Sequence, residues 1–257
     1  MHPALTIFGV TGLPELHDGD DLGGLLARAA AAQGTPLADG DVVVVAQKAV
    51  SKAEGRVADL RTVAPSALAA DFAARWGKDP RAVEVALAEA ARVVRMEAGI
   101  LITETRHGFV CANSGVDASN VGRGPAENGA ETVVLLPMDP DASARAIRDR
   151  VREEASANVA VIVSDTFGRP WREGALNVAI GAAGIAVAAD YRGQTDADGR
   201  LMQTSVIAVG DELAAAAELV TGKRDGVPAA VIRGYAYAPS EDGIAPLMRE
   251  RARDLFR

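Results

Sequence analysis

Two polar segments of this chain carry side chains that could bind a metal ion and phosphate groups. In the first, Asp165 and Thr166 follow the apolar run 159–163, and Arg169 and Arg172 come shortly afterwards. Carboxylate and hydroxyl oxygens are ligands for hard divalent cations, and guanidinium groups bind phosphates or carboxylates. This segment therefore predicts a site for a metal-bound phosphate. An aspartate that caps a helix, followed by surface arginines, would contain the same residues.

The second polar segment, 112–122, is rich in Asn, Ser, Asp and Gly. Asp117 and Asn120 stand three residues apart and could face one ligand, the carboxylate toward a metal ion and the amide toward a base or a ribose. On composition alone, an Asx-rich surface loop is an equally good interpretation. Together, Asp117 and Asp165 would suit one or two divalent ions that bridge phosphates.

Positive charge follows a further apolar run. The segment 41–46 leads directly into Lys48, Lys52 and Arg56. Continuous runs of small β-branched residues are typical of strands that are buried on both faces, and open α/β sheets bind ligands beyond the carboxyl ends of such strands. Both apolar runs are therefore predicted to be buried strands that hold polar groups at one end.

The rest of the chain alternates predicted helices and strands, which indicates a mixed α/β fold. Hydrophobic spacing and capping residues such as Asp21 and Asp79 predict helices over 22–29, 65–76, 80–95, from 137–141 to about 155, 172–180 and 211–220. Further strands are expected over 5–10, 99–105, 108–111, 131–136, 185–189, 201–209 and 229–233. The helical section at about 64–97 could form a separate lobe, and the polar loop 190–200 is a candidate substrate flap.

Composition limits the classes of function. The formal net charge of −8 argues against nucleic acid or an anionic membrane surface as the main partner. The lone Cys111 cannot form an internal disulfide and offers no metal-ligand set, so a reducing cytoplasm fits best. The most apolar stretch, 178–189, is too short to span a bilayer. We therefore expect a cytoplasmic protein that handles small molecules.

The common nucleotide motifs, the P-loop G-x-x-x-x-G-K-[ST] and G-x-G-x-x-G after a strand, are absent. Four other segments, taken in order, resemble the motifs of the coenzyme F420 γ-glutamyl ligases, which are GTP-dependent enzymes. These segments are Gly12-Leu13-Pro14-Glu15, Gln47 to Arg56, Ala112 to Val121, and Ser164 to Arg172. The likeness covers essentially the whole chain. It is especially close to the N-terminal half of the actinobacterial bifunctional form, which carries a flavin-dependent reductase-like domain downstream.

The resemblance implies one ligase domain over 1–257, with an unusual two-lobed mixed α/β fold, no P-loop and an intertwined homodimer. It implies that GTP drives the addition of L-glutamate to F420-0, giving F420-1 and longer forms through an acyl phosphate. Two Mg²⁺ or Mn²⁺ ions per site and a K⁺ ion are the implied cofactors. A reductase-like domain, fused or separate, is an implied partner.

The resemblance also assigns residues. Those that match nucleotide-contacting positions of the family are Leu13, Pro14, Glu15, Gln47, Lys52 and Asn120. Asp117 and Asp165 match ligands of one divalent ion, and Thr166 matches a ligand of a second. Lys223 stands where some members have a metal-contacting side chain, and a lysine puts that contact in doubt. From the chemistry of phosphoryl transfer we expect Lys52, Arg169 and Arg172 to offset developing charge.

Two other classes of function remain compatible with the residues. The same two acidic segments could activate water in a metal-dependent nucleotide phosphohydrolase. The chain could also be a degenerate, non-catalytic ligase domain that serves a partner.

Overall fold

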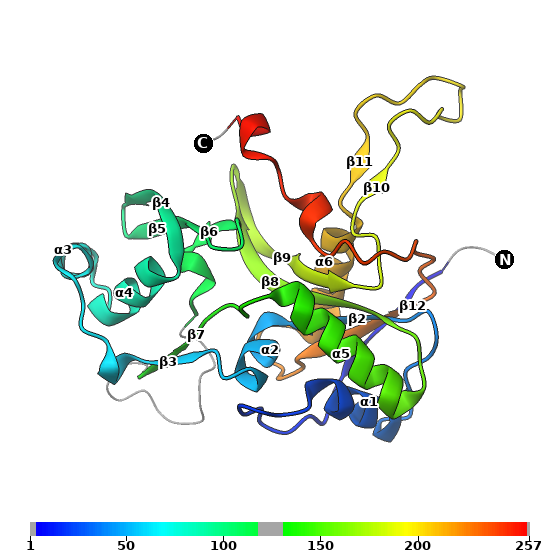
Figure 1. The fold of residues 1–257 in the computed structure, drawn as a ribbon, viewed down its shortest axis with the longest axis horizontal. Helices are drawn as coiled ribbons and strands as arrows, with labels where there is room; N and C mark the ends of the chain where they lie inside the picture. Colours follow the sequence, from blue (N-terminus) through cyan, green and yellow to red (C-terminus); the bar gives the residue numbers. More distant parts are fainter. Residues whose placement is uncertain (1–3, 118–130, 256–257) are drawn as a thin grey trace.

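The structure, a computed structural model that describes residues 4–117 and 131–255, is organised around one five-stranded sheet (Figure 1). In spatial order the strands are β1 (Thr6–Val10), β12 (Ala229–Arg233), β2 (Val42–Ala46), β8 (Ala160–Arg169) and β9 (Arg172–Ala183). β2 and β8 are parallel, and every other neighbouring pair is antiparallel. The predicted mixed α/β class is confirmed.

Helices cover this sheet. They are α1 (Leu22–Ala32), α2 (Gln47–Ala53), α5 (Pro140–Ala155) and α6 (Val209–Thr221). α5 packs against β8 and β9 with α1 beside it, and α6 packs against β9, β12 and β1. Figure 1 shows α5 in front of the sheet and α6 behind it. This cover explains why the valines of β2 and the residues Val161 to Val163 of β8 are buried, as their continuous apolar runs predict.

A buried ion pair joins β12 to the start of β2. The Asp41 side chain is 1% exposed, and Arg233 donates to its two carboxylate oxygens from Nε at 2.8 Å and Nη2 at 2.7 Å. The backbone amide of Ala38 also donates to Asp41. The charge of this buried carboxylate is therefore matched by a bidentate partner.

A smaller group of elements lies beside the main sheet, at the left of Figure 1. It contains α3 (Ala67–Trp76), α4 (Pro80–Ala88), the sheet β4 (Ala90–Glu97), β5 (Ile100–Thr105), β6 (Val110–Ala112), and the pair β3 (Val57–Asp59) and β7 (Thr132–Val134). The 3₁₀ helices η1 (Leu60–Thr62) and η2 (Asn113–Gly115) belong to it. The helices begin where Ser66 and Asp79 cap them, by accepting hydrogen bonds from Ala69 N and Arg81 N.

Four predicted elements are wrong. The helix expected to reach residue 95 ends at Ala88, and 90–97 form β4, which pairs with β5. The helix expected over 172–180 is instead β9, the partner of β8. The strand expected over 201–209 is reduced to β11 (Val206–Ile207), because α6 already begins at Val209. The strand expected over 185–189 is not formed, and of these residues only Ala189 belongs to a strand, the short β10 (Ala189–Asp190). In the first two cases alanine and leucine favour a helix locally, but pairing with a neighbouring strand decides the conformation.

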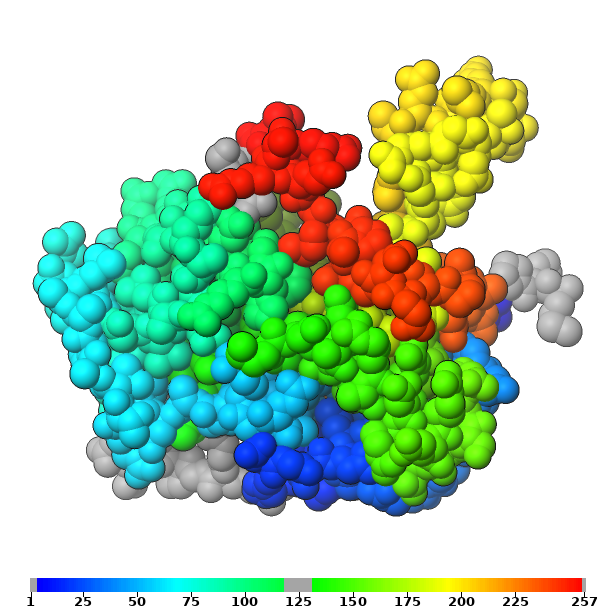
Figure 2. Space-filling view, in the orientation of Figure 1, coloured from blue at the N-terminus to red at the C-terminus, as the bar shows by residue number. Residues whose placement is uncertain are grey.

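The segment 190–207 projects from the body of the molecule (Figure 2, yellow). At its base β10 (Ala189–Asp190) pairs with β11, and it exposes apolar side chains at Tyr191, Leu201, Val206 and Ile207. The chain then ends in the short 3₁₀ helices η3 (Ala245–Leu247) and η4 (Arg251–Arg253). Within the described ranges, no helix combines the length and the apolar composition needed to cross a membrane.

Candidate functional site

The parallel pairing of β2 with β8 brings two of the polar motifs together. The last paired residues are Ala46 and Ser164. α2 begins directly after Ala46 with Gln47, and Asp165 directly follows Ser164. The chain therefore places the α2 lysines and the Asp165 carboxylate at the same end of the two strands.

Asp165 does not stand at the end of its strand, as the sequence suggested. β8 continues to Arg169, because β9 pairs with it beyond the point where β2 ends. In this extension Asp165 lies opposite Val178, and Thr166 lies opposite Asn177. The site residues are consequently held in a two-stranded ladder rather than in a loop.

Asp117 reaches the same region from the smaller group of elements. Its backbone pairs with Val134 through hydrogen bonds of 3.0 and 2.9 Å. Its side chain forms an ion pair with Lys48 of α2, at 2.7 Å between Oδ2 and Nζ. Lys48 is therefore the contact that links α2 to the second polar segment.

The electrostatics of Asp165 confirm that these charges are close to one another. The pKa of its carboxyl is raised to about 6, mainly by burial and in part by the Asp117 carboxylate. The backbone amide of Thr166 opposes this rise by donating a hydrogen bond, and the ammonium groups of Lys223 and Lys48 also oppose it. Two carboxylates and two ammonium groups thus share one electrostatic environment.

Thr166 is fixed by two side chains. Its hydroxyl donates to Asn177 Oδ1 at 2.8 Å, and Lys223 Nζ donates to the same hydroxyl oxygen at 3.2 Å. Lys223 lies in the loop after α6, and the α6 residue Glu218 accepts a hydrogen bond from the backbone of Asn177 at 3.1 Å. The loop after α6 is therefore the fourth part of the chain at this site.

The first loop, Gly12-Leu13-Pro14-Glu15, is held against α2 by an ion pair. Lys52 stands one helical turn after Lys48 and pairs with Glu15 at 2.7 Å. Leu13 packs against the main core, whereas Pro14 and Glu15 are exposed. Side chains at i and i+4 lie on the same face of a helix, so α2 holds both lysines toward the polar segments.

Gln47 is buried at 2% exposure, and its amide nitrogen donates to Ser51 Oγ and to the carbonyl of Leu135, each at 2.7 Å. Its Oε1 is buried and has no hydrogen-bond partner among the described residues. Gln47 therefore fixes α2 to the segment after β7, with one acceptor left for another group. Asn120 lies outside the described residues.

Arg169 and Arg172 lie at the far tip of the β8–β9 hairpin. Arg169 donates to the carbonyls of Gly174 and Glu173 in the same hairpin, and Arg172 is exposed. At the rise of a strand, Arg169 is about 13 Å along β8 from Asp165. Within one chain, the structure does not bring these arginines to the carboxylates.

Among the described residues, no group of three or more His, Cys, Asp or Glu side chains could hold a metal ion by itself. Asp117 and Asp165 nevertheless provide carboxylate oxygens within electrostatic range of each other. Mg²⁺ typically takes one or two protein carboxylates and completes its shell with water and substrate phosphates. The pair therefore fits one divalent ion that a phosphate substrate helps to hold.

Comparison with known proteins decides the family. The family described as F420-0:Gamma-glutamyl ligase matches residues 11–234, which include the described site residues. The chain belongs to this family. It is therefore a ligase.

Curated relatives agree over nearly their whole length. The chain is 46% identical over 256 residues to the coenzyme F420:L-glutamate ligase of Methanothermobacter thermautotrophicus, covering 98% of this chain and 99% of that protein. It is 45% identical over 261 residues to the ligase of the same name from Methanopyrus kandleri, covering 99% and 98%. The ligase of Haloarcula marismortui is 43% identical over 260 residues, covering 98% and 96%.

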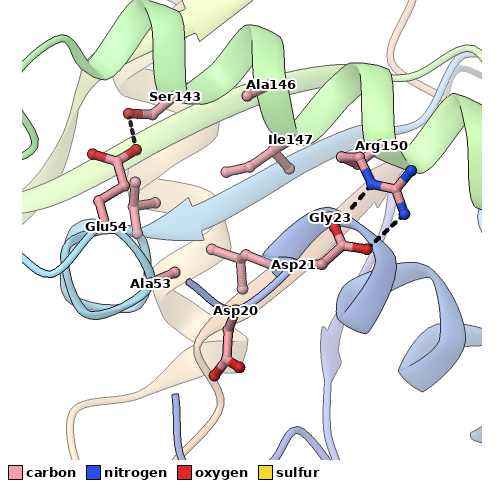
Figure 3. Close-up of a pocket in the computed structure, with 11 residues that line it drawn as sticks. Asp20, Asp21, Gly23, Ala53, Glu54, Ser143, Ala146, Ile147 and Arg150 are labelled. Carbon is pink, nitrogen blue, oxygen red and sulfur yellow. Dashed lines mark hydrogen bonds and ion pairs between the residues drawn. The ribbon is translucent and has the colours of Figure 1, made fainter. Parts of the chain in front are cut away.

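A separate cleft of about 450 Å³ lies between α1, α2 and α5 of this ligase (Figure 3). Arg150 pairs with Asp21 on one side of it, and Ser143 donates to Glu54 on the other. Burial raises the pKa of the Glu54 carboxyl, against the opposing effect of the Ser143 hydrogen bond. No residue that the sequence assigned to the site lines this cleft.

Sequence reasoning missed two side chains of the site, Asn177 and Glu218, which contact Thr166 and its strand neighbour. They depend on β9 and α6 packing beside β8, which local sequence does not reveal. The sequence did single out Lys48 and Lys223, but it did not predict their partners Asp117 and Thr166.

Proposed function

We propose that this ligase adds L-glutamate to F420-0 in a GTP-dependent reaction, giving F420-1 and longer γ-linked forms. The description of the matched family names F420-0, and the names of the curated relatives give coenzyme F420 and L-glutamate. The observation that carries the proposal is the convergence of Asp117 and Asp165, from separate parts of the chain, beside Lys48 and Lys223. Paired carboxylates can bind a divalent metal ion, and ammonium groups beside them can neutralise the charge of a polyphosphate that the metal holds.

The chemistry requires an activated carboxyl group, because a carboxylate does not react with an amine in water. In the proposed reaction an oxygen of the F420-0 carboxylate attacks the γ-phosphorus of GTP, the bond to GDP breaks, and an acyl phosphate forms. The α-amine of glutamate then attacks the acyl carbon, loses a proton, and inorganic phosphate leaves. Positioning and charge neutralisation supply most of the catalysis in phosphoryl transfer.

Asp117 and Asp165 are proposed to hold Mg²⁺ or Mn²⁺. When bound, such an ion neutralises phosphate charge as a Lewis acid. Metal binding at Asp117 would displace the Lys48 ammonium from that carboxylate, and the freed ammonium could then face a phosphate. A bound K⁺ stays a prediction from the family resemblance.

The nucleotide contacts are proposed on α2 and the first loop. The Lys52–Glu15 ion pair supports this, because it fastens the exposed residues Pro14 and Glu15 beside the α2 lysines. Gln47 would use its one unpartnered acceptor, Oε1. Leu13 would act through its backbone, since its side chain packs on the core.

A homodimer is also proposed. The projecting segment 190–207 exposes apolar side chains, and Trp171 at the tip of the β8–β9 hairpin is 81% exposed. Exposed apolar patches mark interaction surfaces in soluble proteins, and a second copy would cover them. A flavin-dependent reductase-like domain, fused or separate, stays a prediction.

The decisive experiment supplies F420-0, L-glutamate, GTP and MnCl₂ or MgCl₂, and follows GDP release together with glutamylated products by mass spectrometry. Asp165→Ala is expected to abolish product, whereas Asp71→Ala, which changes an exposed aspartate of α3, should leave it unchanged. A circular dichroism spectrum like that of the wild type shows that the inactive variant is folded.

The same assay separates the alternatives. GTP hydrolysis that does not depend on glutamate and gives no glutamylated product would indicate the metal-dependent phosphohydrolase. An absence of both hydrolysis and product from folded wild-type protein would indicate a non-catalytic domain. Either result would overturn the proposal.

A further inference from the structure

Lys223 stands where a second divalent ion would need to be. The family resemblance assigns Thr166 to such an ion. In the structure, the Thr166 hydroxyl donates a hydrogen bond to Asn177 Oδ1 and accepts one from Lys223 Nζ at 3.2 Å. A divalent ion on the same oxygen would lie roughly 2 Å from it. The two cations would then compete for one oxygen and repel each other.

The backbone directs Lys223 toward β8. Gly222 ends α6 with φ 58° and ψ 179°, a conformation that is essentially restricted to glycine. A Cβ atom at this position would lie 2.3 Å from Asp225 Oδ2, so that side chain would have to move, and the backbone conformation itself would strain any residue other than glycine. The position of the ammonium therefore depends on how the chain leaves the helix, as well as on a flexible side chain.

Among residues 4–117 and 131–255, those around Thr166 do not offer a set of free oxygen ligands for a second metal ion. Asn177 Oδ1 is used by the Thr166 hydroxyl, and Glu218 accepts from the Asn177 backbone. Asp165 is the nearest carboxylate in sequence, and one of its oxygens accepts the Thr166 amide. A second divalent ion therefore does not fit this arrangement, although the first fits Asp117 and Asp165.

We propose that the Lys223 ammonium takes the place of the second divalent ion, so that this ligase binds one divalent ion per bound GTP. The inference rests on the proposed GTP-dependent function. Thr166 is then the anchor that aims the ammonium at the phosphates. An ammonium on a flexible stem neutralises phosphate charge as a point charge, which is the role that lysine has in other phosphate sites.

The test measures metal stoichiometry and does not depend on turnover. The full chain is dialysed against MnCl₂ with a non-hydrolysable GTP analogue, and bound Mn²⁺ and analogue are both quantified. The wild type is expected to saturate at one Mn²⁺ per analogue. Lys223→Gln, which replaces the charge with an amide oxygen, is expected to bind two. Arg224→Gln is the matched control in the same loop and should behave like the wild type.

Each outcome decides the inference. Two ions in the wild type overturn it and leave the proposed function intact. One ion in Lys223→Gln with unchanged affinity for the analogue also overturns it. One ion in that variant with affinity at least about tenfold weaker supports Lys223 as the phosphate cation. If the wild type does not bind the analogue, the inference and the GTP-dependent function both fail.

Discussion

Lys48 and Asp117 form an ion pair of 2.7 Å that joins the first turn of α2 to the segment after η2. Both side chains are only partly exposed, at 22% and 35%. A metal ion on Asp117 would compete with this lysine for the carboxylate. The contact between α2 and the smaller group of elements therefore depends on whether a metal ion is bound to Asp117.

Replacing Lys48 is expected to weaken catalysis without unfolding the protein. Lys48→Met should lower kcat/KM by about 10- to 100-fold, since one cation beside the phosphates is lost. It should also move the acid limb of the pH–rate profile upward, because the Lys48 ammonium lowers the pKa of Asp165. Lys48→Arg is the control and should retain more activity. A pH profile identical to that of the wild type in Lys48→Met would contradict this role.

Metal binding is expected to fall as the pH drops through about 6. Burial raises the pKa of Asp165 to about 6, and a protonated carboxyl is a poor metal ligand. Titration of the protein with Mn²⁺ between pH 5 and pH 8, followed by electron paramagnetic resonance of free Mn²⁺, measures this directly. An apparent affinity that does not change across this range would show that Asp165 is not a ligand.

The same carboxylate should make the metal-free protein less stable at high pH. The folded-state pKa of Asp165 lies above its ordinary value, so the folded protein binds a proton more tightly than the unfolded chain does. Its contribution to stability is fully present only below the ordinary pKa of 3.8 and is lost as the pH rises from there through about 6. Asp165→Asn should therefore gain stability relative to the wild type between pH 4 and pH 8, by on the order of 1 kcal/mol or more. Urea unfolding at both pH values tests this.

Breaking the Asp41–Arg233 pair should cost far more than breaking a surface pair. Arg233→Met leaves the carboxylate of Asp41 buried without its bidentate partner, which is expected to lower the free energy of unfolding by about 3 to 5 kcal/mol. Arg61→Met, which breaks a pair whose arginine side chain is 64% exposed, should change it by less than about 1 kcal/mol. Similar urea midpoints for the two variants would refute this difference.

The hairpin arginines are expected to act on the site of a second copy, if they are catalytic. Arg172→Ala should then lower turnover by at least about tenfold, and a change under about threefold would remove the arginine from the mechanism. Mixing Arg172→Ala with Asp165→Ala should restore part of the activity, because each copy supplies what the other lacks. Full activity loss in the mixture would place the effect within one chain.

Local signals were enough to predict the ends of several helices. Asp79 and Asp21 each cap the helix that follows, as the polar residue before an apolar pattern indicates, whereas the helix expected from residue 65 begins at Ala67 after the cap Ser66. The segments 90–95 and 172–180 were predicted as helical, because their alanines and valines carry no signal of the strands with which they pair. Elements whose conformation depends on distant partners were the ones that the sequence did not reveal.

The same distinction applies to the site. Strand-end reasoning brought Asp165 near α2, and the structure adds that Asp117 lies within its electrostatic range. The partners of these residues were not predictable, because the Lys48–Asp117 pair and the Lys223–Thr166 contact join segments that are far apart in the sequence. The sequence also did not reveal that Arg169 and Arg172 lie far from Asp165, because this separation depends on the extension of β8 by its pairing with β9.

The parallel alignment of β2 with β8 also has a kinetic consequence. Parallel neighbours require a crossover, and here the connection runs through α2, the smaller group of elements and α5. Closing so long a connection costs chain entropy before its contacts form, which slows folding. Lys48 is synthesised well before Asp117, Asp165 and Lys223. The charge cluster should therefore be completed late, and metal affinity during refolding would report when the last of these segments docks.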